Sequence, residues 1–196
     1  MIPGVTILGV GLLGVTAAQT LAEQPVDPAN PVVAVQTSKG TFTIELFREQ
    51  TPRSMENFLR YVDEGFYEET IFHRVIDGVL IQGGGYTLDG DEKPGHPPIR
   101  LESSQRRKNL RGTVGMARND ATGSARAQFY INLRDNPGFD RTGTRFGYAV
   151  FGRVIEGMNV VERISRVQTS RRGTLSDIPI LPVYVKSVRR LAALGP

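Results

Sequence analysis

Short stretches in which apolar and polar residues alternate, separated by turns, recur along most of this 196-residue chain. Alternation with a period of two is typical of strands that are buried on one face only. Glycine and proline, with 22 and 12 residues, make up about 17% of the chain, whereas about 12% is usual, and this excess supplies many turns. Only two segments show the spacing of an amphipathic helix. The sequence therefore predicts a mainly β fold.

The elements of this fold are expected in a definite order. Residues 32–38 and 41–46 should form a hairpin around a turn at Lys39-Gly40. A helix should begin at Thr51-Pro52 and end at Gly65, because proline suits the first helical position and glycine the residue that follows a helix. Further strands are expected at residues 71–75, 79–82, 112–117, 127–133, 148–151 and 182–191, and a second helix at residues 156–166.

The order of these elements also indicates how the strands are connected. Strands that do not alternate with helices favour an antiparallel sheet over a parallel one. Closing such a sheet into a barrel leaves no exposed strand edge, and helices can plug the open ends. We therefore expect a closed eight-stranded antiparallel barrel capped by two α-helices.

The first 22 residues contain no charged side chain, and residues 5–18 are nearly all apolar or small. This composition is typical of a secretory signal peptide, with cleavage after Ala18 or Ala22. The basic residue that is usual near the start of such a peptide is missing, and a membrane anchor is the alternative. Residues 9–14 also fit the dinucleotide-binding pattern G-x-G-x-x-G, but a proline-rich stretch follows in place of a helix and a second strand.

These features divide the chain into four parts. Residues 1–22 are assigned to a signal peptide or N-terminal anchor, residues 23–31 to a proline-rich linker, residues 32–191 to the folded domain and residues 192–196 to a tail. We expect the domain to be periplasmic or secreted, with no stable membrane insertion after processing. If the first segment is kept, the exported domain would be membrane-anchored.

The scarcity of reactive side chains excludes several classes of function. The chain has no cysteine and two histidines, His73 and His96. Disulfide frameworks, thiol nucleophiles, cysteine-based metal sites and three-histidine metal sites are therefore excluded. We expect neither a cofactor nor a metal ion, and any enzymatic activity should proceed without covalent or metal chemistry.

The charge of the chain is basic but dispersed. The net charge is +4 and the isoelectric point is about 9.6, which is a range in which nucleic-acid-binding proteins are found. The 20 arginines and 4 lysines are scattered, however, and form no continuous basic stripe. Solvated surface charge is the simpler interpretation, and we expect no nucleic-acid partner.

Three stretches resemble the active-site blocks of the cyclophilin family, in the order and spacing of that family. They are residues 72–84 (FHRVIDGVLIQGG), residues 112–118 and 127–132 (GTVGMAR and AQFYIN), and residues 146–152 (FGYAVFG). The short loop at residues 90–98 and Tyr148 resemble the bacterial exported branch. The resemblance covers residues 32–191 and implies a peptidyl-prolyl cis–trans isomerase with an eight-stranded barrel and a helix at each end. It also implies a monomer that acts on proline-containing unfolded or flexible polypeptides.

The residues themselves predict a groove in the same region. Side chains two apart in a strand share a face, and three such pairs combine a polar residue with an apolar or aromatic one. An apolar slot with a few fixed polar groups is what a peptide-binding cleft requires. The pairs are Phe72 with Arg74, Leu80 with Gln82, and Gln128 with Tyr130.

The resemblance assigns a role to each of ten residues. Arg74 would be the catalytic donor to the proline nitrogen, and Gln82 would bind the substrate backbone or orient Arg74. The other eight would bind substrate: Val79, Leu80, Tyr130 and Phe139 in the proline pocket, Ala117 and Arg118 through their backbone against the residue before proline, Gln128 at the border of the groove, and Tyr148 as a hydroxyl donor to the substrate carbonyl.

The chain departs from the family pattern at several of these positions. Valine, leucine and tyrosine stand at positions 79, 80 and 130, where phenylalanine, methionine and phenylalanine are usual. Arg118 replaces a common asparagine, and Gly138 stands where the family has an aromatic residue. These changes leave affinity for the family's cyclic-peptide drug open, and they favour as the alternative a non-catalytic chaperone module that binds proline-containing peptides. His73 is expected on the opposite strand face from Arg74, in a structural role.

Overall fold

A computed structural model of the protein describes residues 24–119 and 123–192. The predicted signal peptide or anchor lies outside the described residues, as does most of the predicted tail. In the described part, one eight-stranded antiparallel sheet contains, in spatial order, β10 (Val185–Arg190), β1 (Val32–Thr37), β2 (Gly40–Leu46), β7 (Val150–Glu156), β5 (Thr113–Met116), β6 (Phe129–Asn132), β4 (Leu80–Gly83) and β3 (Arg74–Ile76). The predicted mainly β fold is confirmed.

The two edges of this sheet curl toward each other without forming a continuous ladder. Ile71 bridges Tyr184, and the backbone N–H of Phe72 donates to the carbonyl of Val183 over 2.9 Å. These contacts precede β3 and lie in an irregular segment, in which Glu69 has a positive φ of 61°. The barrel is therefore half-open along this seam, and the prediction of a fully closed barrel is too strong. The physical reason is that β3 is only three residues long.

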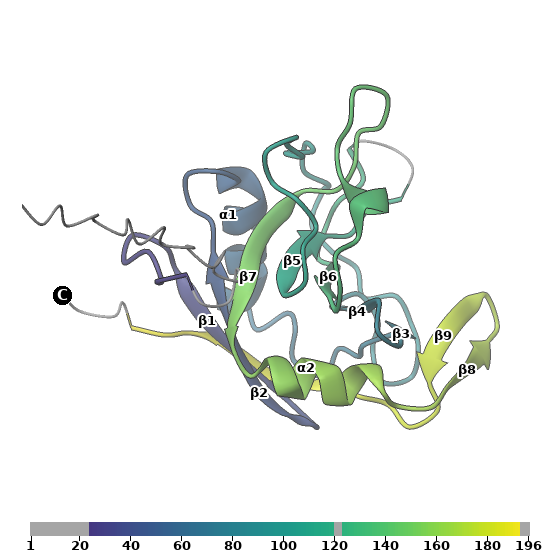
Figure 1. Ribbon diagram of the computed structural model, residues 1–196. Helices are drawn as coiled ribbons and strands as arrows, with labels where there is room; N and C mark the ends of the chain where they lie inside the picture. The colour runs from purple at the N-terminus through teal and green to yellow at the C-terminus, as the bar shows by residue number, and fades with distance from the viewer. Residues whose placement is uncertain (1–23, 120–122, 193–196) are drawn as a thin grey trace, which may run out of the picture.

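Two α-helices lie at opposite ends of the curled sheet in the described part of the chain (Figure 1). Helix α1 (Pro52–Asp63) packs against β7 and β10, and α2 (Met158–Ser165) packs against β2, β3 and β4. The predicted pair of capping helices is confirmed. Helix α2 begins later than expected, because Glu156 is the last residue of β7 and Gly157 turns the chain with a φ of 77°.

The first turn of α1 is capped from a distant part of the chain. Thr51 precedes the helix as predicted, but its hydroxyl donates to the carbonyl of Phe47 and makes no cap. Instead, the Glu102 carboxylate accepts hydrogen bonds from the backbone N–H groups of Arg53 and Ser54, over 3.1 and 2.7 Å. At the other end Gly65, with a φ of 65°, terminates the helix as the sequence predicts.

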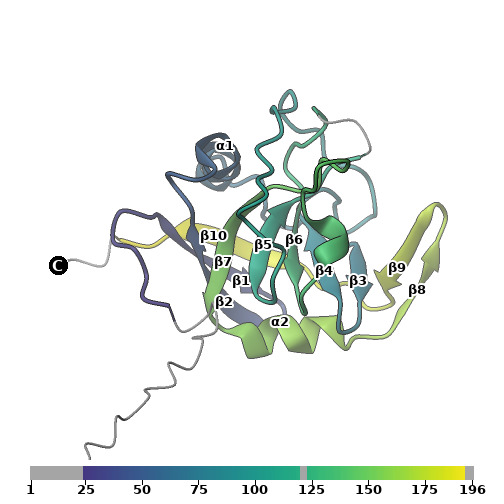
Figure 2. The same cartoon turned by 45° about the horizontal axis from the view of Figure 1, so that its top comes forward.

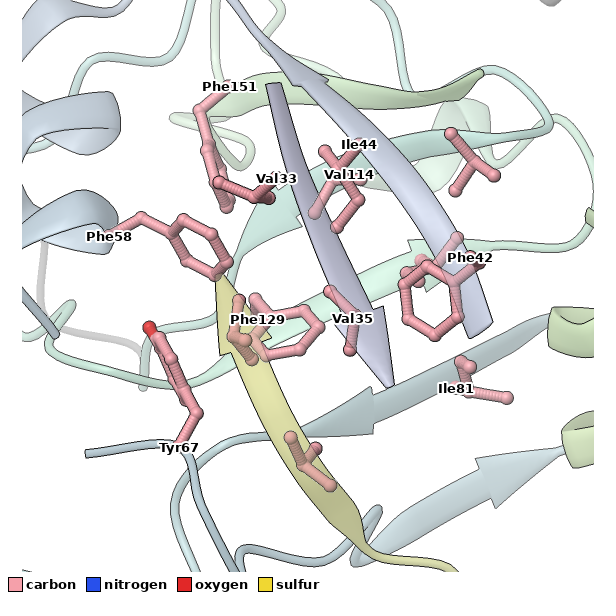
Figure 3. Packing of buried hydrophobic residues seen from close by; sticks show 14 of the residues in the cluster. Val33, Val35, Phe42, Ile44, Phe58, Tyr67, Ile81, Val114, Phe129 and Phe151 are labelled. Atoms are coloured by element: carbon pink, nitrogen blue, oxygen red, sulfur yellow. The ribbon is translucent and has the colours of Figure 1, made fainter. Parts of the chain in front are cut away.

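The interior of the barrel is filled by aromatic and β-branched side chains (Figure 3). Phe58 projects from α1 into the core, where its ring centroid lies 5.5 Å from that of Phe129 and 5.2 Å from that of Phe151. Val33 and Ile44, on β1 and β2, close the core from the other side. Burial of one face of each strand explains the alternating pattern of the sequence.

A two-stranded hairpin that the sequence pattern did not predict projects from the edge of the sheet. It is formed by β8 (Thr169–Arg172) and β9 (Leu175–Pro179), and it lies beside β3 in both views (Figures 1 and 2). A short 3-10 helix, η2 (Pro137–Phe139), follows β6. Both elements border the groove described below.

The described part of the proline-rich stretch is bound to the barrel by a buried ion pair. Arg153 on β7 and Glu45 on β2 are 3% and 2% exposed, and their Nε and Oε2 atoms are 2.5 Å apart. The Arg153 guanidinium also donates to the carbonyls of Gln24 and Pro25, and Glu45 accepts from the backbone N–H of Asp27. The described part of this stretch, residues 24–31, lies on the side of the domain away from the β8–β9 hairpin (Figures 1 and 2). Among residues 24–119 and 123–192, no helix has the length and apolar character needed to cross a bilayer.

Candidate active site

Strand register places the main candidate residues in one row across four strands. Arg74 on β3 pairs with Gln82 on β4, which pairs with Tyr130 on β6, which in turn pairs with Gly115 on β5. Side chains of directly paired residues lie on the same face of a sheet. Two of the three predicted pairs, Leu80 with Gln82 and Gln128 with Tyr130, therefore meet on one surface together with Arg74. The pairing of Phe72 with Arg74 is wrong: Phe72 is buried in the barrel core, because regular β structure begins only at Arg74.

An apolar cluster separate from the barrel core borders this row. Its buried members are Leu80, Ala117 and Tyr130, with Val79, Phe139 and Tyr148 packed against them. The aromatic rings meet edge-on, with centroid distances of 5.6 Å for Tyr130–Phe139 and 5.3 Å for Phe139–Tyr148. The backbone N–H of Tyr148 donates to the Phe139 carbonyl over 2.9 Å and holds η2 against this wall. An apolar slot suited to a small ring is the result.

Nine of the ten predicted site residues line a single cavity of about 460 Å³, which we call the main cavity. Val79 is the exception, since it packs against the apolar cluster without lining the cavity. Residues outside the prediction also contribute to the lining: His73, Tyr86 and the tip of the β8–β9 hairpin at residues 174–176. The structure thus brings the predicted residues together and adds a wall from an element that the sequence pattern did not reveal.

The polar groups of the main cavity are linked to one another. Nη1 of Arg74 donates to Oε1 of Gln82 over a long 3.5 Å, and Nε2 of Gln82 donates to Oε1 of Gln128 over 3.0 Å. The Gln82 amide is therefore held in one orientation, with its oxygen toward Arg74. Among the described residues, no acidic side chain lines this cavity, so no carboxylate there neutralises the guanidinium.

Tyr130 is anchored from below by a buried polar network. Its hydroxyl donates to Oδ1 of Asn109 over 2.6 Å, and Asn109 is held in turn by Asp140 through its backbone N–H and its amide. Burial, with smaller contributions from Tyr148 and Asp140, raises the pKa of Tyr130 well above its usual value. The hydroxyl therefore stays protonated and serves as a donor. Sequence reasoning missed Asn109; the available signal was that a tyrosine on a buried strand requires a polar partner.

Gly115 is the second residue that the sequence reasoning missed. The Tyr130 ring lies directly over it, and a Cβ at position 115 would be 2.2 Å from Cζ of Tyr130. No residue with a side chain can therefore occupy this position while the ring keeps its place. Because Gly115 has no side chain, the Tyr130 ring can lie against the backbone at this position and form the floor of the slot.

His73 differs from the prediction in its position. It is 4% exposed, but it lines the main cavity on the same side as Arg74. Regular β structure begins only at Arg74, so the period-two argument that placed the two side chains on opposite faces does not apply. The ring lies 4.5 Å from that of Tyr86. Burial, with a smaller contribution from the charge of Arg74, lowers the pKa of His73 to about 4, so the imidazole is neutral near pH 7.

A curled antiparallel barrel with an arginine beside an apolar slot is an arrangement suited to binding a peptide at the surface. The family model of cyclophilin type peptidyl-prolyl cis-trans isomerases matches residues 32–189. The chain belongs to this family. Its activity is therefore the cis–trans isomerisation of peptide bonds that precede proline.

Relatives of the chain include bacterial, fungal and plant isomerases. It is 43% identical to peptidyl-prolyl cis-trans isomerase A of Dickeya dadantii over 157 residues, which are 80% of this chain and 83% of the relative. It is 45% identical to an isomerase of Acinetobacter baylyi, covering 82% of this chain and 86% of that one. Isomerase B of Escherichia coli is 43% identical, with coverages of 80% and 98%.

Solved structures agree with the fold. A cyclophilin type isomerase of Cryptosporidium parvum superposes with a TM-score of 0.68 at 25% identity, covering 85% of this chain and 99% of the other. A second structure of that protein, in the presence of the dipeptide Ala-Pro, gives a TM-score of 0.67 at 26% identity, with coverages of 82% and 99%.

Proposed function

We propose that Arg74 is the catalytic residue of this isomerase and that Gln82 is its positioning partner. The observation that carries the proposal is the row of Arg74, Gln82 and Tyr130 across β3, β4 and β6, with the guanidinium facing the same cavity as the apolar slot. A proline held in the slot has its ring nitrogen on the side of Arg74.

The chemistry follows from the amide bond. Rotation of an X–Pro bond has a barrier of about 18–20 kcal/mol, because the nitrogen lone pair is delocalised into the carbonyl. In the twisted transition state the nitrogen becomes pyramidal and its lone pair can accept a hydrogen bond. A guanidinium beside the nitrogen donates to this lone pair more strongly in the transition state than in the planar ground state, and this difference lowers the barrier. Neither a covalent intermediate nor a proton transfer is required.

The other residues of the cavity bind and orient the chain. Leu80, Tyr130 and Phe139 form the slot for the proline ring, and Tyr148 places a hydroxyl at its rim. The backbone of Ala117 and Arg118 contacts the residue before proline, and Gln128 borders the groove while fixing Gln82. The related Cryptosporidium parvum structure in the presence of Ala-Pro supports a proline-containing ligand.

We also propose that the domain acts outside the cytoplasm, as a monomer, on unfolded or flexible polypeptides. The uncharged, apolar composition of residues 1–22 supports export, and the relatives at 43–45% identity described above are bacterial. Cell fractionation of the natural host, with N-terminal sequencing of the recovered protein, tests this. Recovery from the cytoplasm alone, with residues 1–22 intact, would contradict export.

Substitution of Arg74 tests the catalytic proposal. Arg74→Ala should lower kcat/KM for a proline-containing tetrapeptide by about 100-fold, the usual effect of removing one donor to a transition state, while peptide affinity changes little. Arg163→Ala, which removes an exposed arginine of α2, is the matched control and should retain full activity. Unchanged activity of Arg74→Ala would refute the role of Arg74. Binding without any acceleration in the unaltered protein would instead favour a non-catalytic chaperone module.

A further inference from the structure

A second cavity adjoins the main cavity at a junction formed by three residues. The second cavity has a volume of about 610 Å³ and extends toward the loop at residues 92–95. Ala117, Arg118 and Gln128 line both cavities. A peptide that places proline in the slot and continues into the second cavity must therefore pass Arg118.

The Arg118 side chain is fixed at this junction. Its Nε and Nη2 atoms donate to the carbonyl of Gly147 over 3.1 and 3.0 Å, and Nη1 donates to the carbonyl of Asn119 over 2.7 Å. The guanidinium carbon lies 4.8 Å from the ring centroid of Tyr148. Three of the five guanidinium N–H donors are used in these bonds to described residues, so two are left for a ligand. Because the side chain is already ordered, binding through it loses little conformational entropy.

The charge of the two cavities is strongly one-sided. Among the described residues, their only acidic lining residue is Glu92, against four basic ones: Arg74, Lys93, Arg118 and Arg126. Lys93 and Arg126 are held by backbone carbonyls, through bonds of 2.6 Å to Phe66 and 2.8 Å to His96. Clefts lined by one sign of charge concentrate ligands of the opposite sign.

We propose that Arg118 gives the enzyme a preference for substrates with an acidic side chain at one of the two positions before proline. The proposal rests on the proposed function, which places the residue before proline against Ala117 and Arg118. A carboxylate at that position accepts charge-assisted hydrogen bonds from the remaining N–H groups of Arg118. Arg118 is thus a specificity-determining residue, and Arg74 supplies the catalysis.

Isosteric peptides test this preference. Two-dimensional exchange NMR measures kcat/KM for peptides of the form Ala-Ala-X-Pro-Phe, in which X is Glu, Gln or Lys, and for matched peptides with the same residues one position earlier or directly after proline. At low salt, Glu should exceed Gln by roughly threefold to tenfold at one position before proline, as a half-buried charge pair allows. Lys should be the poorest substrate, and about 0.5 M salt should reduce the preference.

Variants assign the preference to one side chain. Arg118→Gln should bring the Glu-to-Gln ratio to about one, whereas Arg118→Lys should retain part of the preference. Arg163→Gln is the matched control and should keep the ratio of the unaltered protein. Equal rates for the Glu and Gln peptides, or a preference that appears only after proline, would overturn the inference. If no peptide isomerised faster with the protein than without it, the proposed function itself would be refuted.

Discussion

The close contact between Gly115 and the Tyr130 ring can be tested with a single methyl group. In Gly115→Ala the added Cβ would lie 2.2 Å from Cζ and 2.3 Å from Oη of Tyr130, whereas ordinary contacts begin at about 3.4 Å. The ring must therefore move by about 1.2 Å. Overpacking of this kind costs about 1–3 kcal/mol, and loss of the hydrogen bond to Asn109 costs about 1 kcal/mol more. We expect the free energy of unfolding to fall by about 2–4 kcal/mol.

The same displacement should affect catalysis, because Tyr130 forms the floor of the proline slot. A shift of about 1 Å at a positioning residue can lower the rate by about 100-fold, so kcat/KM should fall by about 10-fold to 100-fold. Urea unfolding and a peptide isomerisation assay measure the two effects.

A matched control and a double variant define the outcome. Gly143→Ala makes the same change where no atom lies within 4 Å of the added methyl group, and it should have neither effect. In a Tyr130→Ala background, the methyl group at position 115 should cost little stability, because the atoms that it meets are gone. The reasoning would be refuted if Gly115→Ala matched Gly143→Ala in both stability and activity.

Two further predictions concern stability. Because burial lowers the pKa of His73 from its usual value of about 6.5 to about 4, the unfolded chain takes up a proton between these two pH values while the folded protein does not. The contribution of His73 to the free energy of unfolding should therefore be complete above about pH 6.5 and decrease by up to about 3 kcal/mol toward pH 4. Urea unfolding at several pH values measures this, and His73→Gln should lose this part of the pH dependence. An unchanged pH dependence in His73→Gln would contradict the assignment. Glu102→Ala removes the acceptor for the first turn of α1 and should lower the free energy of unfolding by about 1–2 kcal/mol. The exposed Glu56→Ala serves as its control, and equal stability of the two variants would argue against the cap.

Local signals account for what the sequence predicts correctly. The hairpin of β1 and β2 follows from alternation around Lys39-Gly40, and α1 follows from Pro52 at its start and Gly65 at its end. Each of these features depends on residues a few positions apart. The cap of α1 does not, since Glu102 lies about fifty residues from the helix that it caps.

The elements that the pattern missed lack a buried face or depend on distant pairing. All four residues of β8 are exposed, so its sequence carries no alternation, and its strand is defined by pairing with β9. The predicted barrel is confirmed except for its full closure at the seam, where residues 69–72 bond to residues 183–185 without forming a regular strand.

The residues of the candidate site could be predicted from the sequence, but the pairing of the strands that brings them together could not. Period-two spacing placed Leu80 with Gln82 on one face, and the family resemblance supplied the other residues. Tyr130 lies above Gly115 because β5 and β6 are neighbours in the sheet. No local sequence pattern predicts that pairing. Val79 packs against the apolar cluster of the slot but does not line the main cavity.

The buried pair of Arg153 and Glu45 also determines how the domain is presented to its surroundings. By holding Gln24 and Pro25 against β7, it makes the chain enter the barrel on the side away from the hairpin that borders the main cavity (Figures 1 and 2). A group attached directly before Gln24 would therefore lie on the side of the domain away from this hairpin. Long polypeptides could reach the groove equally well in a tethered and in a released form, so immobilisation through the N-terminal side should leave turnover intact.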